Sequence, residues 1–290
     1  MATKKANINP NNSTNSSLAN AAREILYIIK VGGNIIDDDE KLEDFLQQFA
    51  KLKSPSAGTV IKKILVHGGG KLATKLAEQV GIPQQLVDGR RITDAETLKI
   101  VTMVYAGYIN KNIVAKLQAN GCNAIGLSGA DGNIIEAHKR NHPSIDYGYA
   151  GDVDVINTSL LKTLLDEDIA PVIAPITHDK KGQLLNTNAD TIAQEIAAAM
   201  SVLFDVNLIY SFEKTGVLLD ANDDSTVIRF IKPDYYAQLK AEKKIFAGMI
   251  PKIDNAFVAL NSGVKQVTIG KAEELQKLIS HSAGTSITNE

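Results

Sequence analysis

The sequence predicts an α/β fold in which one open, mainly parallel β-sheet lies between two layers of helices, a three-layer αβα sandwich. Three observations lead to it: short runs of β-branched and aliphatic residues, longer segments with helical apolar spacing, and alternation of the two along the chain. Most of the short runs are continuously apolar, as in strands that are covered on both faces. A chain of 290 residues has room for one large or two modest domains, and we expect two packed lobes.

The expected strands begin once the polar N-terminal segment has ended. Their ranges are 25–31, 61–67, 124–127, 170–174, 207–212 and 266–269. Two further β-segments, 86–92 and 134–138, have glycine and aspartate around them. We expect these two to be short hairpin strands inserted on the sheet, and they are the candidates for a lid.

Helical segments lie between the strands, with apolar residues three or four positions apart. Their ranges are 38–52, 71–80, 94–120, 159–166, 190–200, 234–243 and 252–261. The longest, 94–120, carries Ile100, Val104, Tyr105 and Ile113. This segment is the candidate surface of a homodimer, although burial of the same four residues in the core fits the pattern equally well.

Composition divides the chain into a tail and two lobes. Residues 1–24 are crowded with Asn, Ser and Thr and hold too few apolar side chains to offset the cost of ordering, so we expect a disordered tail. The N-terminal lobe is placed at 25–204 and the C-terminal lobe at 205–290, because a helix ends near residue 201 and a fresh strand–helix series follows.

Charge and cysteine content exclude several classes of protein. Lys and Arg number 31 and Asp and Glu 33, so the formal net charge is −2 and nucleic-acid binding is not expected. A single cysteine, Cys122, excludes an internal disulfide framework and a cysteine-rich metal site. No apolar run approaches the length of a membrane span, and the first 24 residues lack a signal-peptide pattern. We expect a cytoplasmic protein that has no membrane partner and no metal site of its own.

Two glycine-rich loops follow the first two expected strands, KVGGN at 30–34 and HGGGK at 67–71. Glycine lets backbone N–H groups approach an anion closely, and the lysines add positive charge. The second loop also opens a helix, whose N-terminus attracts anions. Each loop is otherwise an ordinary tight turn, so one loop alone decides nothing.

Three further segments add groups that bind anions: DGRRIT at 88–93, NTNAD at 186–190 and AGMIPK at 247–252. An arginine in the first can hold a carboxylate through two hydrogen bonds, although an exposed basic pair needs no function. The amides of the second are alternatively helix caps. Lys252 lies in the first turn of an expected helix, where its positive charge is unfavourable because it opposes the helix dipole. A lysine at this position therefore suggests a functional role. Together the five segments favour group transfer between anionic substrates.

A nicotinamide-dependent oxidoreductase is the rival enzyme class. Gly68-x-Gly70-x-x-Ala73 fits the dinucleotide fingerprint, and Asp88 lies where a ribose-binding acid belongs. However, only Leu86 and Val87 precede Asp88, where a second buried strand is required. The match is therefore weak.

The five segments, in this order and at these intervals, resemble the amino acid kinase family from about residue 25 to the end of the chain. The set is most similar to members that phosphorylate N-acetyl-L-glutamate. The resemblance implies ATP-dependent phosphorylation of the γ-carboxylate to N-acetyl-L-glutamyl 5-phosphate, the second step of arginine biosynthesis. N-succinyl-L-glutamate remains an alternative acceptor, and a non-catalytic regulator with a kinase fold remains an alternative class.

The resemblance also implies roles for individual residues. Lys30 and Lys252 would neutralise the transferring phosphoryl group, Asp190 would orient both lysines, and the backbone of Gly33 would line the same group. The acceptor would be held by Gly69, Gly70, Arg91, Asn186 and Asn188. The nucleotide would be held by Ser211, Glu213, Gly216, Lys244, Phe246, Gly248 and Met249. Mg²⁺ would be bound through the phosphates of ATP.

Two segments depart from the family pattern. Residues 211–216 read SFEKTG, where relatives generally carry a Thr-Asp-Val turn, and this difference bears on the nucleotide contacts. Lys71 follows the glycines where relatives often have proline, and this difference bears on the pocket for the acyl group. The N-terminal segment also lacks the extra helix of arginine-inhibited hexamers, so the resemblance implies a homodimer that arginine does not inhibit.

Overall fold

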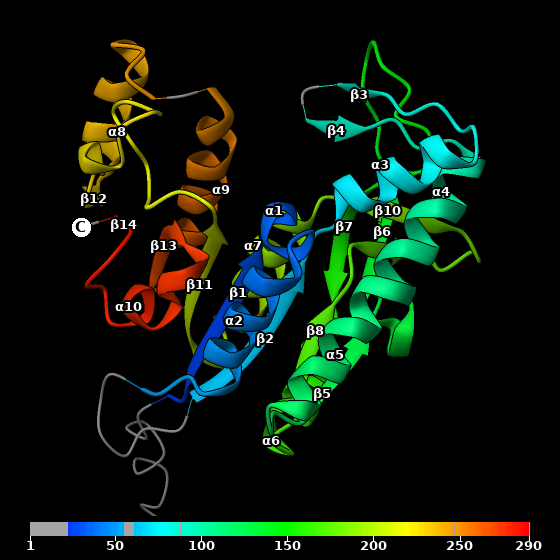
Figure 1. Ribbon diagram of the computed structural model, residues 1–290, viewed down its shortest axis with the longest axis horizontal. Helices are drawn as coiled ribbons and strands as arrows, with labels where there is room; N and C mark the ends of the chain where they lie inside the picture. Colours follow the sequence, from blue (N-terminus) through cyan, green and yellow to red (C-terminus); the bar gives the residue numbers. More distant parts are fainter. Residues whose placement is uncertain (1–22, 55–60, 88, 246, 290) are drawn as a thin grey trace, which may run out of the picture.

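One eight-stranded sheet runs through the protein between two layers of helices (Figure 1). The computed structural model describes residues 23–54, 61–87, 89–245 and 247–289. Except for Arg23 and Glu24, the predicted disordered tail lies outside the described residues. The strands of the sheet are β1 (Ile25–Val31), β2 (Ile61–His67), β5 (Ala124–Leu127), β8 (Ala170–Ile173), β11 (Asp205–Phe212), β12 (Phe230–Ile231), β13 (Gln266–Lys271) and β14 (Thr285–Ile287).

The order of the strands confirms the predicted fold class. It is β12-β14-β13-β11-β1-β2-β8-β5, and every neighbouring pair is parallel except β13 and β14. All six predicted strands are present, and none of their ends differs by more than two residues from the expected range. The edge strand β12 and its neighbour β14 were not predicted, because two and three residues are too short to show a pattern.

Helices cover both faces of the sheet. One layer holds α6 (Thr158–Asp166), α7 (Ala189–Met200), α8 (Pro233–Ala241) and α9 (Ile250–Asn261). The other holds α2 (Asp39–Ala50), α3 (Gly70–Gln79), α4 (Ala95–Thr102), α5 (Asn110–Ala119) and α10 (Leu275–Ile279). The short helix α1 (Gly33–Ile36) follows β1 directly. Each predicted helix is therefore present, and α1 and α10 are additional.

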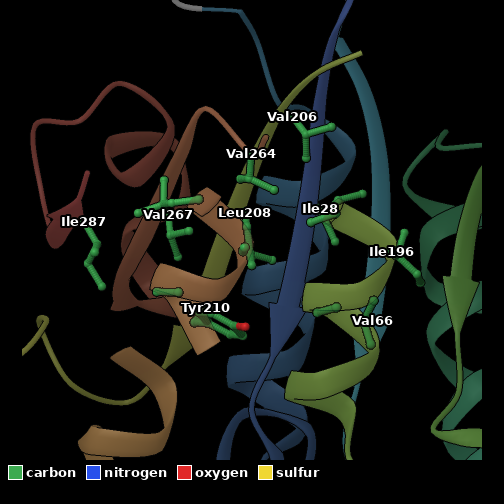
Figure 2. Close-up of a cluster of buried hydrophobic side chains, with 14 of the residues drawn as sticks. Ile28, Val66, Ile196, Val206, Leu208, Tyr210, Val264, Val267 and Ile287 are labelled. Atoms are coloured by element: carbon green, nitrogen blue, oxygen red, sulfur yellow. The ribbon is translucent and has the colours of Figure 1, made fainter. Parts of the chain in front are cut away.

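Alternate residues of the central strands pack against opposite layers, as the pleat of a strand requires. Ile28 belongs to the core cluster under α7 and α9, whereas Ile29 belongs to the cluster under α2 and α5. Ile28 is in register with Leu208, and Leu208 with Val267, so one apolar row crosses the sheet beneath α7 and α9 (Figure 2). Both core clusters draw residues from either side of position 204, so the two proposed lobes share one core.

The long helical segment is interrupted by a π-helical stretch, Met103–Ile109, between α4 and α5. Ile100, Val104, Tyr105 and Ile113 are all buried in the subunit core. Of the two readings that the sequence left open for these residues, core packing is the correct one. The exposed apolar side chains of the stretch are instead those of Met103 and Tyr108.

Two small β-structures, a two-stranded hairpin and a four-stranded barrel, are separate from the large sheet. Strands β3 (Leu86–Val87) and β4 (Arg90–Arg91) form the predicted hairpin, which lies at the opposite side of the molecule from α8 and α9 in Figure 1. Strands β6 (Ile135–Lys139), β7 (Ala150–Ile156), β9 (Ile176–His178) and β10 (Leu184–Thr187) close into a four-stranded barrel. Of these four, only β6 was predicted. None of the helices in the described ranges is long and apolar enough to cross a membrane.

Candidate active site

The two glycine-rich loops meet because β1 and β2 are parallel neighbours that end at the same edge of the sheet. A Cβ atom built on Gly33 would lie 4.0 Å from the backbone nitrogens of both Gly69 and Gly70. One built on Gly68 would lie 3.8 Å from the nitrogen of Gly33. Gly33 and Gly70 are also the first residues of α1 and α3. Several backbone N–H groups therefore gather at one place, as an anion site requires.

Only glycine fits at position 69. Its φ is +141°, which L side chains rarely adopt, and a Cβ atom would come within 2.2 Å of Cδ1 of Ile109. The π-helical stretch thus packs directly on the loop through its last residue. The side chain of Ile109 therefore lies directly against the backbone of Gly69.

Lys30, Asp190 and Lys252 meet above the end of β1, although they come from three distant parts of the chain. Lys30 is the penultimate residue of β1, Asp190 lies in the first turn of α7, and Lys252 lies in the first turn of α9. Nζ of Lys30 is 2.7 Å from Oδ1 of Asp190, and Nζ of Lys252 is 2.5 Å from Oδ2. One carboxylate therefore binds both ammonium groups, an arrangement that the family resemblance implied.

The charges of this lysine–aspartate–lysine cluster are largely removed from water. The three side chains are only 13%, 16% and 23% exposed for Lys30, Asp190 and Lys252. Burial opposes the charge of Asp190, but the two ammonium groups outweigh it and hold the pKa of Asp190 well below its usual range. Burial lowers the pKa of Lys30, the charge of Lys252 lowers it further, and Asp190 acts in the opposite direction. Two positive charges against one negative leave a surplus that suits a phosphoryl group.

Two clefts share Lys30 and Gly33 in their walls. The first has a volume of about 240 Å³ and is also lined by Gly69, Gly70, Arg91, Asn186, Asn188 and Asp190. The second, of about 560 Å³, is also lined by Phe212, Glu213 and Lys252. The cluster and the glycine loops therefore lie where the clefts join, so that a group bound in one can reach a group bound in the other.

The predicted acceptor-binding side chains are held by the protein itself. Nη2 of Arg91 donates to the carbonyl oxygen of Gly70 and to Oγ1 of Thr74, both at 2.9 Å, and Nη1 donates to Gln84. Three of the five N–H donors of this guanidinium are thus engaged, and the hydroxyl of Tyr105 also interacts with it. Asn186 donates to Oγ1 of Thr93 at 3.0 Å.

Asn188 caps α7. Its Oδ1 accepts hydrogen bonds from the backbone N–H groups of Asp190 at 2.9 Å and Thr191 at 3.1 Å. The capping alternative raised from the sequence therefore describes this side chain, which also lines the first cleft. By ordering the first turn of α7, the cap fixes the position of Asp190.

The predicted nucleotide-binding residues are only partly brought together. Glu213 faces the second cleft beside Lys252, and Gly248 and Met249 directly precede α9. Ser211 is buried, its carbonyl oxygen accepts a hydrogen bond from Gly32 at 2.9 Å, and its hydroxyl has no partner among the described residues.

The other three residues of that set are placed elsewhere. Gly216 packs against Thr285, where a Cβ atom would meet Oγ1 at 2.6 Å, and it lines neither cleft. Lys244 is exposed and pairs with Glu242 at 2.7 Å. Phe246 lies outside the described residues.

His67 and Asn110 form a buried pair that the sequence analysis missed. Nδ1 of His67 is 2.8 Å from the carbonyl oxygen of Gly68, and Nε2 is 3.1 Å from Nδ2 of Asn110, which also donates to the carbonyl oxygen of Val172 at 2.9 Å. Burial lowers the pKa of His67 to about 4, so the ring is neutral at pH 7. The position of a histidine directly before three glycines was the available signal.

The dinucleotide alternative does not fit this geometry. Asp88 lies outside the described residues, and Leu86 and Val87 belong to an exposed hairpin strand rather than to the large sheet. The fingerprint requires a second buried strand directly before its acidic residue. The glycines of residues 68–70 are therefore not part of a complete dinucleotide-binding motif.

Comparison with known proteins decides the family. The sequence profile of the amino acid kinase family matches residues 26–271. The chain belongs to the amino acid kinase family. It is 58% identical over 255 residues to an acetylglutamate kinase of Cytophaga hutchinsonii, a match that covers 88% of this chain and 94% of that protein. It is 52% identical over 265 residues to an acetylglutamate kinase of Phocaeicola vulgatus, covering 91% and 99%.

A solved structure of this amino acid kinase fold is also similar. The protein smu.665 from Streptococcus mutans UA159 superimposes with a TM-score of 0.71 and is 28% identical, and the match covers 91% of this chain and 99% of that one. The similarity extends over both lobes that were proposed from the sequence. The amino acid kinase fold described above is thus supported by sequence and by structure.

Proposed function

We propose that this amino acid kinase transfers the γ-phosphoryl group of ATP to the γ-carboxylate of N-acetyl-L-glutamate, in the arginine-biosynthetic pathway. The observation that carries the proposal is the Lys30–Asp190–Lys252 cluster, which faces the glycine loops where two clefts join. Curated relatives that are 51–58% identical and are named acetylglutamate kinase support the acceptor.

The chemistry needs charge and position rather than a general base. A carboxylate is already ionised near neutral pH, so one of its oxygens can attack the γ-phosphorus directly. A new O–P bond forms while the bond from phosphorus to the β,γ-bridging oxygen breaks, and ADP leaves with that electron pair. No proton moves. Lys30 and Lys252 neutralise the phosphoryl oxygens, and the backbone N–H groups of the glycine loops donate to them.

The two clefts divide the substrates. The first, with Arg91, Asn186 and Asn188, suits the acylated amino acid, because a guanidinium and amides bind an α-carboxylate. The second is larger and lies between Glu213, Lys252 and the start of α3, and we assign it to ATP. The C-terminal lobe, residues 205–290, would then supply much of the nucleotide site.

Mg²⁺ would be held through the ATP phosphates. The carboxylate of Asp190 is occupied by two lysines, and the described residues contain no group of three or more His, Cys, Asp or Glu side chains that could hold a metal ion. The ion would neutralise phosphate charge when bound with the nucleotide. The residues present fit this mode of binding.

We also propose that the protein is a homodimer of the cytoplasm, the compartment expected from its sequence. Met103 and Tyr108 are 56% and 66% exposed on the π-helical stretch, and an isologous contact between two such stretches would bury both. Light scattering of the wild type and of a Tyr108→Glu variant tests this assembly. A wild-type monomer would exclude it.

The reaction is tested by ADP release from Mg-ATP with N-acetyl-L-glutamate, with free glutamate and aspartate as controls. Hydroxylamine traps the acyl phosphate and identifies the bond that was made. We expect turnover with the acylated substrate alone. Binding of substrate without turnover would favour the regulator with a kinase fold.

A further inference from the structure

Two arginines that the proposed reaction does not use line the acceptor cleft. Arg90, on β4, and Arg140, directly after β6, form part of the wall that also contains Arg91. In the proposed reaction the γ-carboxylate lies beside Lys30 and the glycine loops, which line the same cleft. Arg91 and Asn186 account for the α-carboxylate. The remaining substituent of the α-carbon is the N-acyl group, so the acyl group is the part of the acceptor that meets Arg90 and Arg140.

The protein neutralises only one of these two guanidinium groups with an ion pair among the described residues. Arg140 forms a short ion pair with Asp152 on β7 and lies against the ring of Tyr147, 5.7 Å from its centroid. Arg90 is half-buried and makes neither a hydrogen bond nor an ion pair through its side chain within the described ranges. Burial and then the charge of Arg140 lower the pKa of Arg90, while Asp152 acts against them. Among the described residues, two guanidinium charges against one carboxylate leave one positive charge at the cleft.

An acetyl group would leave that charge without a partner. Its terminal methyl group offers nothing to a guanidinium, and a cation that loses water without gaining an acceptor is costly. A carboxylate at the far end of a longer acyl chain would accept hydrogen bonds from Arg90 and bring the net charge of the Arg90–Arg140–Asp152 group to zero.

We propose that Arg90 and Arg140 form an anion subsite for the acyl group, so that the preferred acceptor is an N-acyl-L-glutamate whose acyl chain ends in a carboxylate, as in N-succinyl-L-glutamate. The inference rests on the proposed function and changes only the acyl group of its acceptor. The reacting carboxylate, the phosphoryl donor and the bond that forms are unchanged.

The test compares kcat/KM for N-succinyl-L-glutamate and N-acetyl-L-glutamate in the wild type and in Arg90→Leu. We expect the wild type to favour the succinyl substrate, and the variant to lower the succinyl-to-acetyl ratio about ten- to a hundredfold, the usual loss for a charged hydrogen bond. The change should appear mainly in the KM for the succinyl substrate, because the contact is remote from the reacting bond. Arg90→Lys should restore part of the ratio.

Lys139→Leu is the matched control. It removes one positive charge next to Arg140, but Lys139 lines neither cleft and pairs with Asp146 at 3.4 Å. We expect the ratio to stay within about twofold of the wild type, because the screened field of an exposed charge is weak. An equal fall in this control would overturn the subsite, since a general field would then explain the effect.

The failures of the two proposals are distinguishable. Turnover of N-acetyl-L-glutamate with no preference for the succinyl substrate, and no change of the ratio in Arg90→Leu, would overturn the subsite and leave the kinase. Absence of turnover with both acylated glutamates would overturn the proposed function and the subsite with it.

Discussion

Asp190→Asn is the substitution that tests the lysine–aspartate–lysine cluster most directly. It keeps the shape of the side chain but removes the negative charge that lies 2.7 Å from Lys30 and 2.5 Å from Lys252. At an effective dielectric constant of about 20, each contact represents about 6 kcal/mol of attraction before the cost of removing the charges from water. Breaking a buried ion pair by removing one partner costs about 3–5 kcal/mol in practice.

We therefore expect Asp190→Asn to lower the free energy of unfolding by about 3 kcal/mol, the lower end of that range, because 16% of the side chain is exposed. Chemical denaturation at pH 7 measures the change. Asp166→Asn is the control, since Asp166 binds Lys162 at the same distance, 2.7 Å, but both side chains are exposed. An exposed pair should contribute less than about 1 kcal/mol.

The same variant has a kinetic signature. Asp190 raises the pKa of Lys30, which burial lowers, so its loss lets the pKa of Lys30 fall further. Lys30 then loses its proton at a lower pH, and the kcat of the variant should decline with rising pH over a range in which the wild-type kcat is constant. At pH 7 we expect kcat to fall by about 10²–10³-fold, measured by hydroxamate formation. A folded variant with kcat within tenfold of the wild type and an unchanged pH profile would refute the role of Asp190.

Three further predictions follow from the site. Lys30→Ala and Lys252→Ala should each lower kcat by about 10²–10³-fold with little effect on KM, whereas Arg91→Ala should mainly raise the KM for the acceptor; steady-state kinetics with equal KM effects in all three would contradict these roles. His67, with a pKa of about 4 in the folded protein and 6.5 when exposed, binds its proton more readily in the unfolded chain between these values. Stability should therefore fall by about 2 kcal/mol between pH 7 and pH 5, and denaturant titrations of His67→Gln should lack this component. Gly69→Ala should lower kcat, because the left-handed backbone and the contact with Ile109 force the loop to move; wild-type kinetics in that variant would show that the loop tolerates a side chain.

The parts of the fold that the sequence predicts are those in which local pattern and tertiary environment agree. The strand of residues 25–31 is apolar at every position except Lys30 because it lies in the middle of the sheet with helices on both faces, and its ends were predicted without error. Three of the four strands of the small barrel were not predicted. Thr177 and Thr187 are buried there and hydrogen-bonded to each other, so the strands that carry them lack a clear apolar alternation.

In the candidate active site, too, the sequence predicts the residues that follow a local pattern but not those brought together by tertiary packing. Both glycine loops were found because they follow recognisable strands, and parallel neighbours must end at one edge. The meeting of Lys30 with Lys252 could not be read from spacing, because it depends on how α7 and α9 pack on the sheet and on each other. It was inferred from the family resemblance alone. Arg90 was missed as a separate group because RR in a sequence does not show that Arg91 binds Gly70 while Arg90 lines the cleft without such a bond among the described residues.

The π-helical stretch connects these observations. A π-helix is rare and is frequently found at functional sites. Here its last residue, Ile109, contacts the position of Gly69, and the next residue, Asn110, binds His67, whose other ring nitrogen binds the carbonyl of Gly68. The last residue of the π-helical stretch and the first residue of α5 therefore both contact the glycine loop or the histidine before it. Because catalysis in this site depends on where backbone N–H groups point rather than on a reactive side chain, the structural cost of the π-helix is best explained by the position it gives to residues 68–70.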